Sequence, residues 1–241
     1  MVKTFTKRFL LVLLASLMLW GCKIPLPWVK KIDMTRSTPE GLYQQGVEYY
    51  QDKSYKRAAE IFQRVKEEYP LSQLALMAEL GIGDAYFSAK EYTEAELAYS
   101  EFVNLHPTNE NLPYAMYQLG MCHFNQIDTI DRDQAEAFKA LKEFERLMAR
   151  FPDSKFSFLA EKTIRDCRKL LGEQEFYVGE FYFNIKQYQA ALRRFEKVAR
   201  EYANVGLDYK VRYYIAETKR LIADEEAKKK AEEMKAKTAT K

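Results

Sequence analysis

Apolar residues recur at helical spacing along most of the chain, and one set of residue types returns at fixed distances from a glycine. Tyrosine lies three and nine positions after that glycine, alanine twelve, an aromatic residue sixteen and proline twenty-four. Copies begin at Gly46, Gly83 and Gly179, and only the last lacks the proline, because Ala203 takes its place. Such spacing, repeated along the chain, predicts pairs of helices.

A fourth copy begins at Gly120, but its second half is displaced by eight residues. The extra residues fall around 126–133, where aspartate and threonine are frequent, so we expect a longer loop inside that helix pair. Small residues let two helices approach closely, aromatic rings fill the space between neighbouring pairs, and proline ends the second helix. This spacing resembles the tetratricopeptide repeat.

No single helix pair can bury its own apolar face, so the pairs must stack on one another. We therefore predict an all-α protein, a superhelical solenoid of about five tetratricopeptide-like helix pairs, or about ten helices, over residues 38–223. Residues 154–171 and 207–223 are expected to form separate amphipathic helices within it. Residues 224–241 are charged without an apolar face, which predicts a fraying helix or a disordered tail.

Residues 1–21 have the pattern of a bacterial lipoprotein signal peptide. Three basic residues precede an apolar run of twelve residues, which is shorter than the roughly 20 needed to span a bilayer. The run ends in Leu-Trp-Gly-Cys, which resembles a lipobox, although Trp20 stands where a small residue is usual. We expect Cys22 to be lipidated and residues 22–37 to form a tether. Lys23 in place of an aspartate favours the outer membrane. An uncleaved anchor or an ordinary secretory signal are the alternatives.

Composition excludes several classes of function. The formal net charge is only +3, which argues against a nucleic-acid partner. His106 and His123 are not at metal-ligand spacing with any cysteine, so we expect neither a metal site nor a cofactor. We expect no catalysis, because the sequence has no phosphate loop, nucleophile elbow or histidine–carboxylate motif. Cys122 and Cys167 are expected to be small buried residues, with a disulfide between them as the alternative.

In tetratricopeptide repeats, four positions around the glycine of each first helix face a concave groove. These positions are mostly aromatic or apolar in the first three repeats, which predicts a groove for extended apolar peptides. The alternative is that these side chains belong to the core. The predicted groove residues are Tyr43, Val47, Tyr50, Leu80, Phe87, Tyr114, Tyr117, Met121 and Phe124, and the same mapping adds Glu40, Met77 and Asp84.

A more specific resemblance rests on Glu-Glu-Tyr-Pro-Leu at 67–71, Leu-His-Pro-Thr-Asn at 105–109, Asp-Arg-Asp at 131–133 and the segment 175–182. Together with the lipobox and the loop insertion, these resemble the BamD family, the lipoproteins of the β-barrel assembly machinery. The resemblance implies a scaffold that is lipid-anchored in the outer membrane and faces the periplasm. Its N-terminal repeats would receive the C-terminal strand of nascent outer-membrane proteins.

The resemblance also implies partners for the C-terminal repeats. These would dock a POTRA domain of a BamA-like barrel protein, with other lipoproteins of the assembly complex nearby. In the matching segment we expect Arg194 to contact the partner, and a solvated arginine is the alternative. Another tetratricopeptide lipoprotein adaptor, such as a pilotin or a cell-envelope coordinator, is the alternative function.

Overall fold

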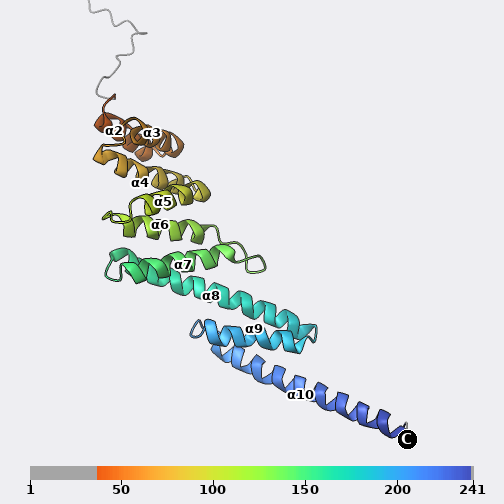
Figure 1. Ribbon diagram of the computed structural model, residues 1–241. Helices are drawn as coiled ribbons and strands as arrows, with labels where there is room; N and C mark the ends of the chain where they lie inside the picture. Colours follow the sequence, from red (N-terminus) through yellow and green to blue (C-terminus); the bar gives the residue numbers. More distant parts are fainter. Residues whose placement is uncertain (1–36, 240–241) are drawn as a thin grey trace, which may run out of the picture.

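The computed structural model describes residues 37–239, which form nine helices and no strand in that range. The predicted signal peptide, Cys22 and nearly all of the tether lie outside the described residues. The all-α solenoid is confirmed. Figure 1 labels the helices: α2 (Pro39–Gln51), α3 (Tyr55–Glu68), α4 (Gln73–Ser88), α5 (Tyr92–Leu105), α6 (Leu112–Asn125), α7 (Ala135–Arg150), α8 (Lys155–Asn184), α9 (Tyr188–Glu201) and α10 (Asp208–Ala239).

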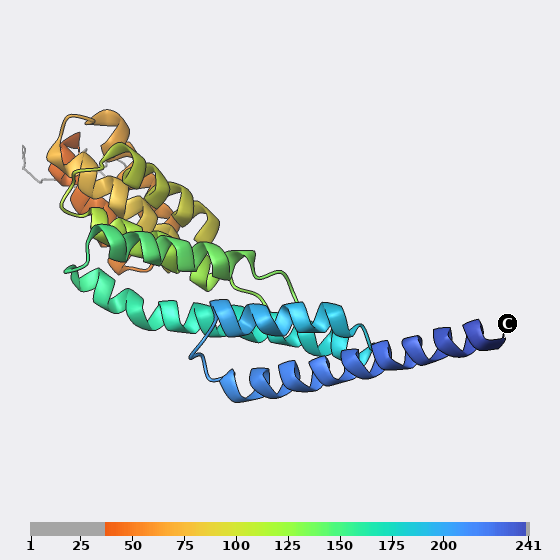
Figure 2. The same cartoon turned by 60° about the horizontal axis from the view of Figure 1, so that its bottom comes forward.

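Each helix packs mainly on its neighbours along the chain, with further contacts between α2 and α4 and between α6 and α8. The result is an elongated stack, and the end of α10 projects beyond it (Figures 1 and 2). Such an arrangement is expected of a repeat protein, in which each unit buries its apolar face against the next.

Glycine on the first helix of a pair lets an aromatic ring of the second helix lie directly on its backbone. At four glycines, an added Cβ atom would lie 2.6 Å from a ring carbon, closer than real Cβ contacts come. The repeated glycine and aromatic positions therefore form the same contact in four helix pairs. The contacts are Gly46–Phe62, Gly83–Tyr99, Gly120–Phe144 and Gly179–Phe195.

The turns inside the regular helix pairs share one conformation that the sequence did not reveal. A lysine occupies the left-handed region in each turn, with φ of 59° or 62°, a conformation usually taken by glycine or asparagine. The lysines are Lys53, Lys90 and Lys186. The third pair instead has the predicted longer loop between α6 and α7, where the Gln134 amide donates to the carbonyl oxygens of Thr129 (2.7 Å) and Arg132 (3.2 Å).

Helix α8 differs from the prediction, because one helix of 30 residues replaces the two that were expected. It is about 45 Å long at the usual rise per residue. Gly172 does not end it. Instead this glycine lies against Tyr202, whose Cβ would be 3.0 Å from an added Cβ. Leu171 belongs to the central core and Phe176 to the C-terminal core, so α8 joins the two.

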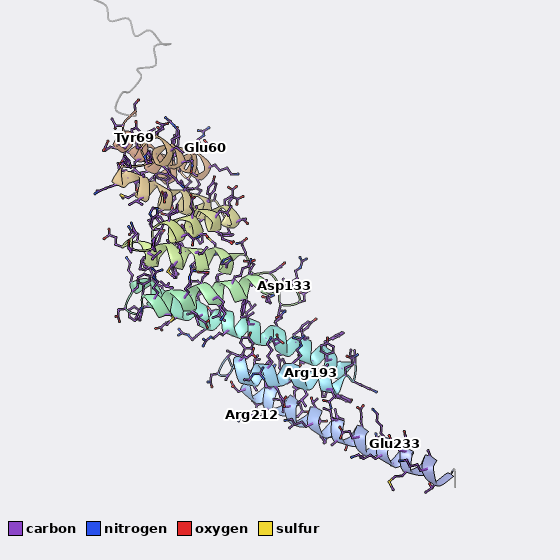
Figure 3. All side chains as sticks on the ribbon, viewed as in Figure 1. Glu60, Tyr69, Asp133, Arg193, Arg212 and Glu233 are labelled. Atoms are coloured by element: carbon purple, nitrogen blue, oxygen red, sulfur yellow. The ribbon has the colours of Figure 1, made fainter. Side chains whose placement is uncertain are left out.

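Helix α10 continues as helix through residues 224–239, where the sequence predicted either a fraying helix or a disordered tail. These residues are exposed as far as Thr238, and Glu233, labelled in Figure 3, lies on the projecting part. Alanine, glutamate and lysine have high helix propensity, and ion pairs such as Arg220–Asp224 (3.0 Å) add local support. Helix propensity explains this segment, which lacks tertiary packing.

We predict that Gly179→Ala lowers the free energy of unfolding by about 1–3 kcal/mol, because the new methyl group overlaps the Phe195 ring. In a Phe195→Leu background the cost should disappear, since alanine is otherwise favoured over glycine in a helix by about 1 kcal/mol. Urea unfolding of the two single variants and the double variant measures this coupling. An equal cost in both backgrounds would contradict the contact.

Candidate functional site

A pocket lies between α2 and α4, at the N-terminal end of the stack. It has a volume of about 150 Å³. Five of the positions predicted to face the groove line this pocket. Three of them lie on α2, and the other two, Met77 and Asp84, lie on α4. The lining residues are Tyr43, Val47, Tyr50, Phe62, Met77, Gly81 and Asp84.

The two tyrosines of the pocket are held by contacts that fix their rings. The Tyr43 ring packs on Phe62, with ring centroids 5.5 Å apart. Tyr50 packs edge-on against Tyr55 at 5.4 Å, and its hydroxyl shares a hydrogen bond of 2.8 Å with the Ser88 Oγ. Both side chains are partly buried, so they offer a preformed apolar surface that costs little conformational entropy on binding.

Asp84 is the charged group of this pocket. Its Oδ1 accepts hydrogen bonds from the hydroxyls of Tyr99 (2.6 Å) and Tyr114. Burial raises the pKa of the Asp84 carboxyl, and the two hydrogen bonds only partly oppose this. Burial and the nearby Asp84 charge also raise the pKa of both tyrosines, which therefore act as hydrogen-bond donors.

The other predicted groove residues are less uniform. Leu80 is only 9% exposed and belongs to the central core, so the groove assignment fails for it. Tyr117 packs between Phe144 (5.8 Å) and Phe156 (5.9 Å). Phe87, Tyr114, Met121 and Phe124 are likewise partly buried against that core. At these positions much of each side chain belongs to the core, as the alternative prediction stated, because helices of the following repeats cover it.

Arg194 lies on α9, next to Arg193, which is labelled in Figure 3. Its Nη1 donates to the Glu175 Oε2 at 2.9 Å, and the Lys197 ammonium binds the other oxygen of that carboxylate. Burial raises the pKa of Glu175, but the hydrogen bonds from Lys197 and Arg194 outweigh it and the net pKa is lowered. Arg194 is thus partly exposed but held by an ion pair, rather than freely solvated.

His123, Glu96 and Glu136 form a cluster at which sequence reasoning expected no metal. Their ligand atoms lie within 4.8 Å of one another, as a cation site would require. The His123 Nδ1 is 2.8 Å from a Glu136 oxygen and 3.6 Å from a Glu96 oxygen. Lys139 already pairs with Glu136 at 2.8 Å, so the cluster has its own counter-charge. Sequence reasoning missed it because the three residues lie on three different helices.

Cys122 and Cys167 are free and buried, so the structure contradicts a disulfide between them. Burial raises the pKa of both thiols to about 12, with smaller contributions from Glu96 and Asp166 respectively. Both behave as small apolar core residues. No helix among residues 37–239 combines the length and apolar character needed to cross a membrane.

Comparison with known proteins adds a family relationship. A family model described as YfiO, outer membrane lipoprotein, matches residues 35–234. The outer membrane protein assembly factor BamD of Rickettsia prowazekii is 30% identical over 178 residues, which are 73% of this chain and 69% of that protein.

Proteins with the same name from two other bacteria are also similar. The one from Neisseria gonorrhoeae is 28% identical, with 73% of this chain and 70% of that protein covered. The one from Vibrio cholerae is 24% identical, with 70% of this chain and 73% of that protein covered. Among solved structures, a TPR protein of Thermus thermophilus covers 75% of this chain and 98% of its own at 16% identity, with a TM-score of 0.42.

We predict that Asp84→Asn raises the melting temperature by about 2–4 °C at neutral pH. The pKa of Asp84 is raised in the folded state, so its ionisation destabilises the fold. This loss of stability is absent below the unfolded pKa and develops as pH rises through the folded pKa. The asparagine side chain is uncharged, and its amide oxygen can still accept hydrogen bonds from the hydroxyls of the two tyrosines.

Thermal unfolding followed by circular dichroism, at neutral pH and below pH 3.8, measures the difference between Asp84→Asn and the native protein. The gain should vanish at the lower pH. Asp153→Asn, at an exposed turn position, is the control and should change little. A lower melting temperature at neutral pH would show that the charged hydrogen bonds outweigh burial.

Proposed function

The chain belongs to the YfiO family of outer membrane lipoproteins, and from this premise we propose that it is an assembly factor for outer membrane proteins. The observation that carries the proposal is the family match over 35–234, which takes in nearly all of the described solenoid. The match extends through the inserted loop between α6 and α7, which favours this role over that of a pilotin or cell-envelope coordinator. The proposal assigns the protein binding functions and no catalytic step.

We place the protein at the outer membrane with its repeats in the periplasm. Lipid on Cys22 would hold it there, since more than one acyl chain on a lipoprotein gives stable anchoring. The first helix of the solenoid, α2, begins at Pro39, seventeen residues after that cysteine, so the groove between α2 and α4 lies next to the anchor along the chain. The anchor would thus keep the groove close to the membrane that its clients enter.

The groove is proposed to receive the C-terminal strand of nascent outer-membrane proteins. Support comes from the pocket lined by Tyr43, Val47 and Tyr50, where rigid aromatic side chains form part of the wall. An extended strand presents alternate side chains to one side, and aromatic anchors in such pockets dominate binding energies. The partly buried aromatics of α6 would extend the same surface.

The C-terminal repeats are proposed to dock a POTRA domain of a BamA-like barrel protein, with other assembly lipoproteins as further partners. Arg194 supports this, because its ion pair with Glu175 holds it in a fixed position while 41% of its side chain remains exposed. Tyr177 and Phe181, one turn apart on α8, are more than half exposed and add apolar surface on the same unit. Aromatic and arginine side chains are the residues enriched at such interfaces.

We predict that a peptide copying the last ten or so residues of an outer-membrane barrel protein, about one membrane strand in length, binds with micromolar or tighter affinity. Tyr50→Ala should weaken binding about tenfold, since it removes a pocket wall. Phe87→Ala and Tyr117→Ala should weaken it less, because the core covers more of those rings. Fluorescence anisotropy with labelled peptide measures each affinity.

Tyr177→Ala is the matched control, since this exposed aromatic lies on α8 outside the groove. It should leave peptide affinity unchanged. Binding that is undetectable with the folded native protein, or that falls equally with Tyr177→Ala, would overturn the receptor role.

We further predict that Arg194→Ala weakens binding of the purified POTRA region about tenfold or more. Lys197→Ala is the informative control, because it removes the other partner of Glu175 and leaves Arg194 in place. Binding should survive Lys197→Ala if Arg194 contacts the partner directly. Equal losses in the two variants would show that Arg194 acts only by holding Glu175. Surface plasmon resonance with the immobilised POTRA region measures both.

A further inference from the structure

We propose that the pocket between α2 and α4 takes a lysine or arginine side chain of the segment bound in the groove, with Asp84 as its charged partner. The inference rests on the proposed function, because it names what the peptide must present at this point of the groove. Asp84 lines the pocket, and a groove for apolar peptides does not explain why a charged residue lies there.

Asp84 lacks a cationic partner among the residues that the structure describes. Its two hydrogen bonds both reach Oδ1, and both come from neutral tyrosine hydroxyls. Across residues 37–239 the Oδ2 atom receives neither a hydrogen bond nor an ion pair, and no lysine or arginine contributes to the carboxyl's electrostatics. A carboxylate kept in such a place destabilises the fold unless something pairs with it.

The contrast with Glu175 shows what the fold does with a similar carboxylate elsewhere. Glu175 has a cation on each oxygen, and its pKa is lowered. Asp84 lines a pocket, has two hydroxyls on one oxygen and no partner on the other among residues 37–239, and its pKa is raised. The Asp84 oxygen without a partner therefore points to a cation that comes from outside the described chain.

The walls of the pocket fit a long cationic side chain. Tyr43, Tyr50 and Phe62 supply aromatic rings, which attract a cation at their faces, and Met77 with Val47 supplies surface for an aliphatic stem. The volume of about 150 Å³ has room for one such side chain. The Asp84 charge contributes to raising the pKa of Tyr43, second to burial, so its field reaches across the pocket.

Other occupants fit less well. A peptide's terminal carboxylate would meet the Asp84 charge, and like charges at close range disfavour binding. A metal ion would find a single carboxylate here, since no other acidic or histidine side chain lines the pocket. The segment's terminal carboxylate must therefore lie elsewhere along the groove, while a basic side chain within the segment enters the pocket.

The test uses the purified full-length protein and labelled peptides of one extended apolar sequence with a single variable central position. The position carries lysine, methionine or glutamate, and anisotropy gives each affinity. The lysine peptide should bind about tenfold more tightly than the methionine peptide, and the glutamate peptide most weakly. In Asp84→Asn the lysine and methionine peptides should bind equally, whereas the Asp153→Asn control should keep the native preference.

A second measurement does not depend on peptide binding. Titration with n-butylammonium, followed by NMR, should shift signals of Tyr43, Tyr50 and Met77 in the native protein, and these shifts should be lost in Asp84→Asn. Shifts by this cation with no binding of any peptide would sink the proposed groove function and leave the cation pocket standing. Peptides that bind without regard to charge, together with no shifts, would overturn the pocket and leave the groove.

Discussion

The contact between a backbone glycine and an aromatic ring holds each helix pair at a short distance, and the stack depends on it. The same approach of 2.6 Å to an added Cβ occurs at Gly46, Gly83, Gly120 and Gly179. Close-packed interiors tolerate little extra volume, so each of these positions excludes any larger side chain without repacking. The contact also occupies one face of each first helix, which leaves another face to line the pocket at α2 and α4.

Two carboxylates, Asp84 on α4 and Glu175 on α8, have opposite environments. Glu175 is neutralised by Arg194 and Lys197, so its charge stabilises the fold at neutral pH and that stabilisation is lost as pH falls through its lowered pKa. Asp84 is held only by tyrosine hydroxyls, so its charge costs stability. A fold that keeps an unfavourable charge beside a pocket is typical of a binding site, where local stability is given up for recognition.

The length of α8 relates the two ends of the molecule. It passes from the central core into the C-terminal core without a break, and it carries Glu175 on the second half. A continuous helix is stiffer than two helices joined by a turn, so the unit around Arg194 is held in a defined relation to the repeats that form the groove. Figure 2 shows this helix running along the junction between the two halves of the stack.

The sequence alone determined the repeat, the helix pairs and the inserted loop, because glycine, aromatic and proline residues at fixed spacing report local packing and helix ends. It placed Tyr43, Val47 and Tyr50 at a common surface, but it misassigned Leu80 to the groove, since burial depends on which later helix covers a side chain. The helix expected over residues 154–171 continues to Asn184, and Gly172 within it is a packing position. Only the tertiary structure showed that Asp84, Tyr99 and Tyr114 meet, because their three helices are brought together by stacking and not by spacing along the chain.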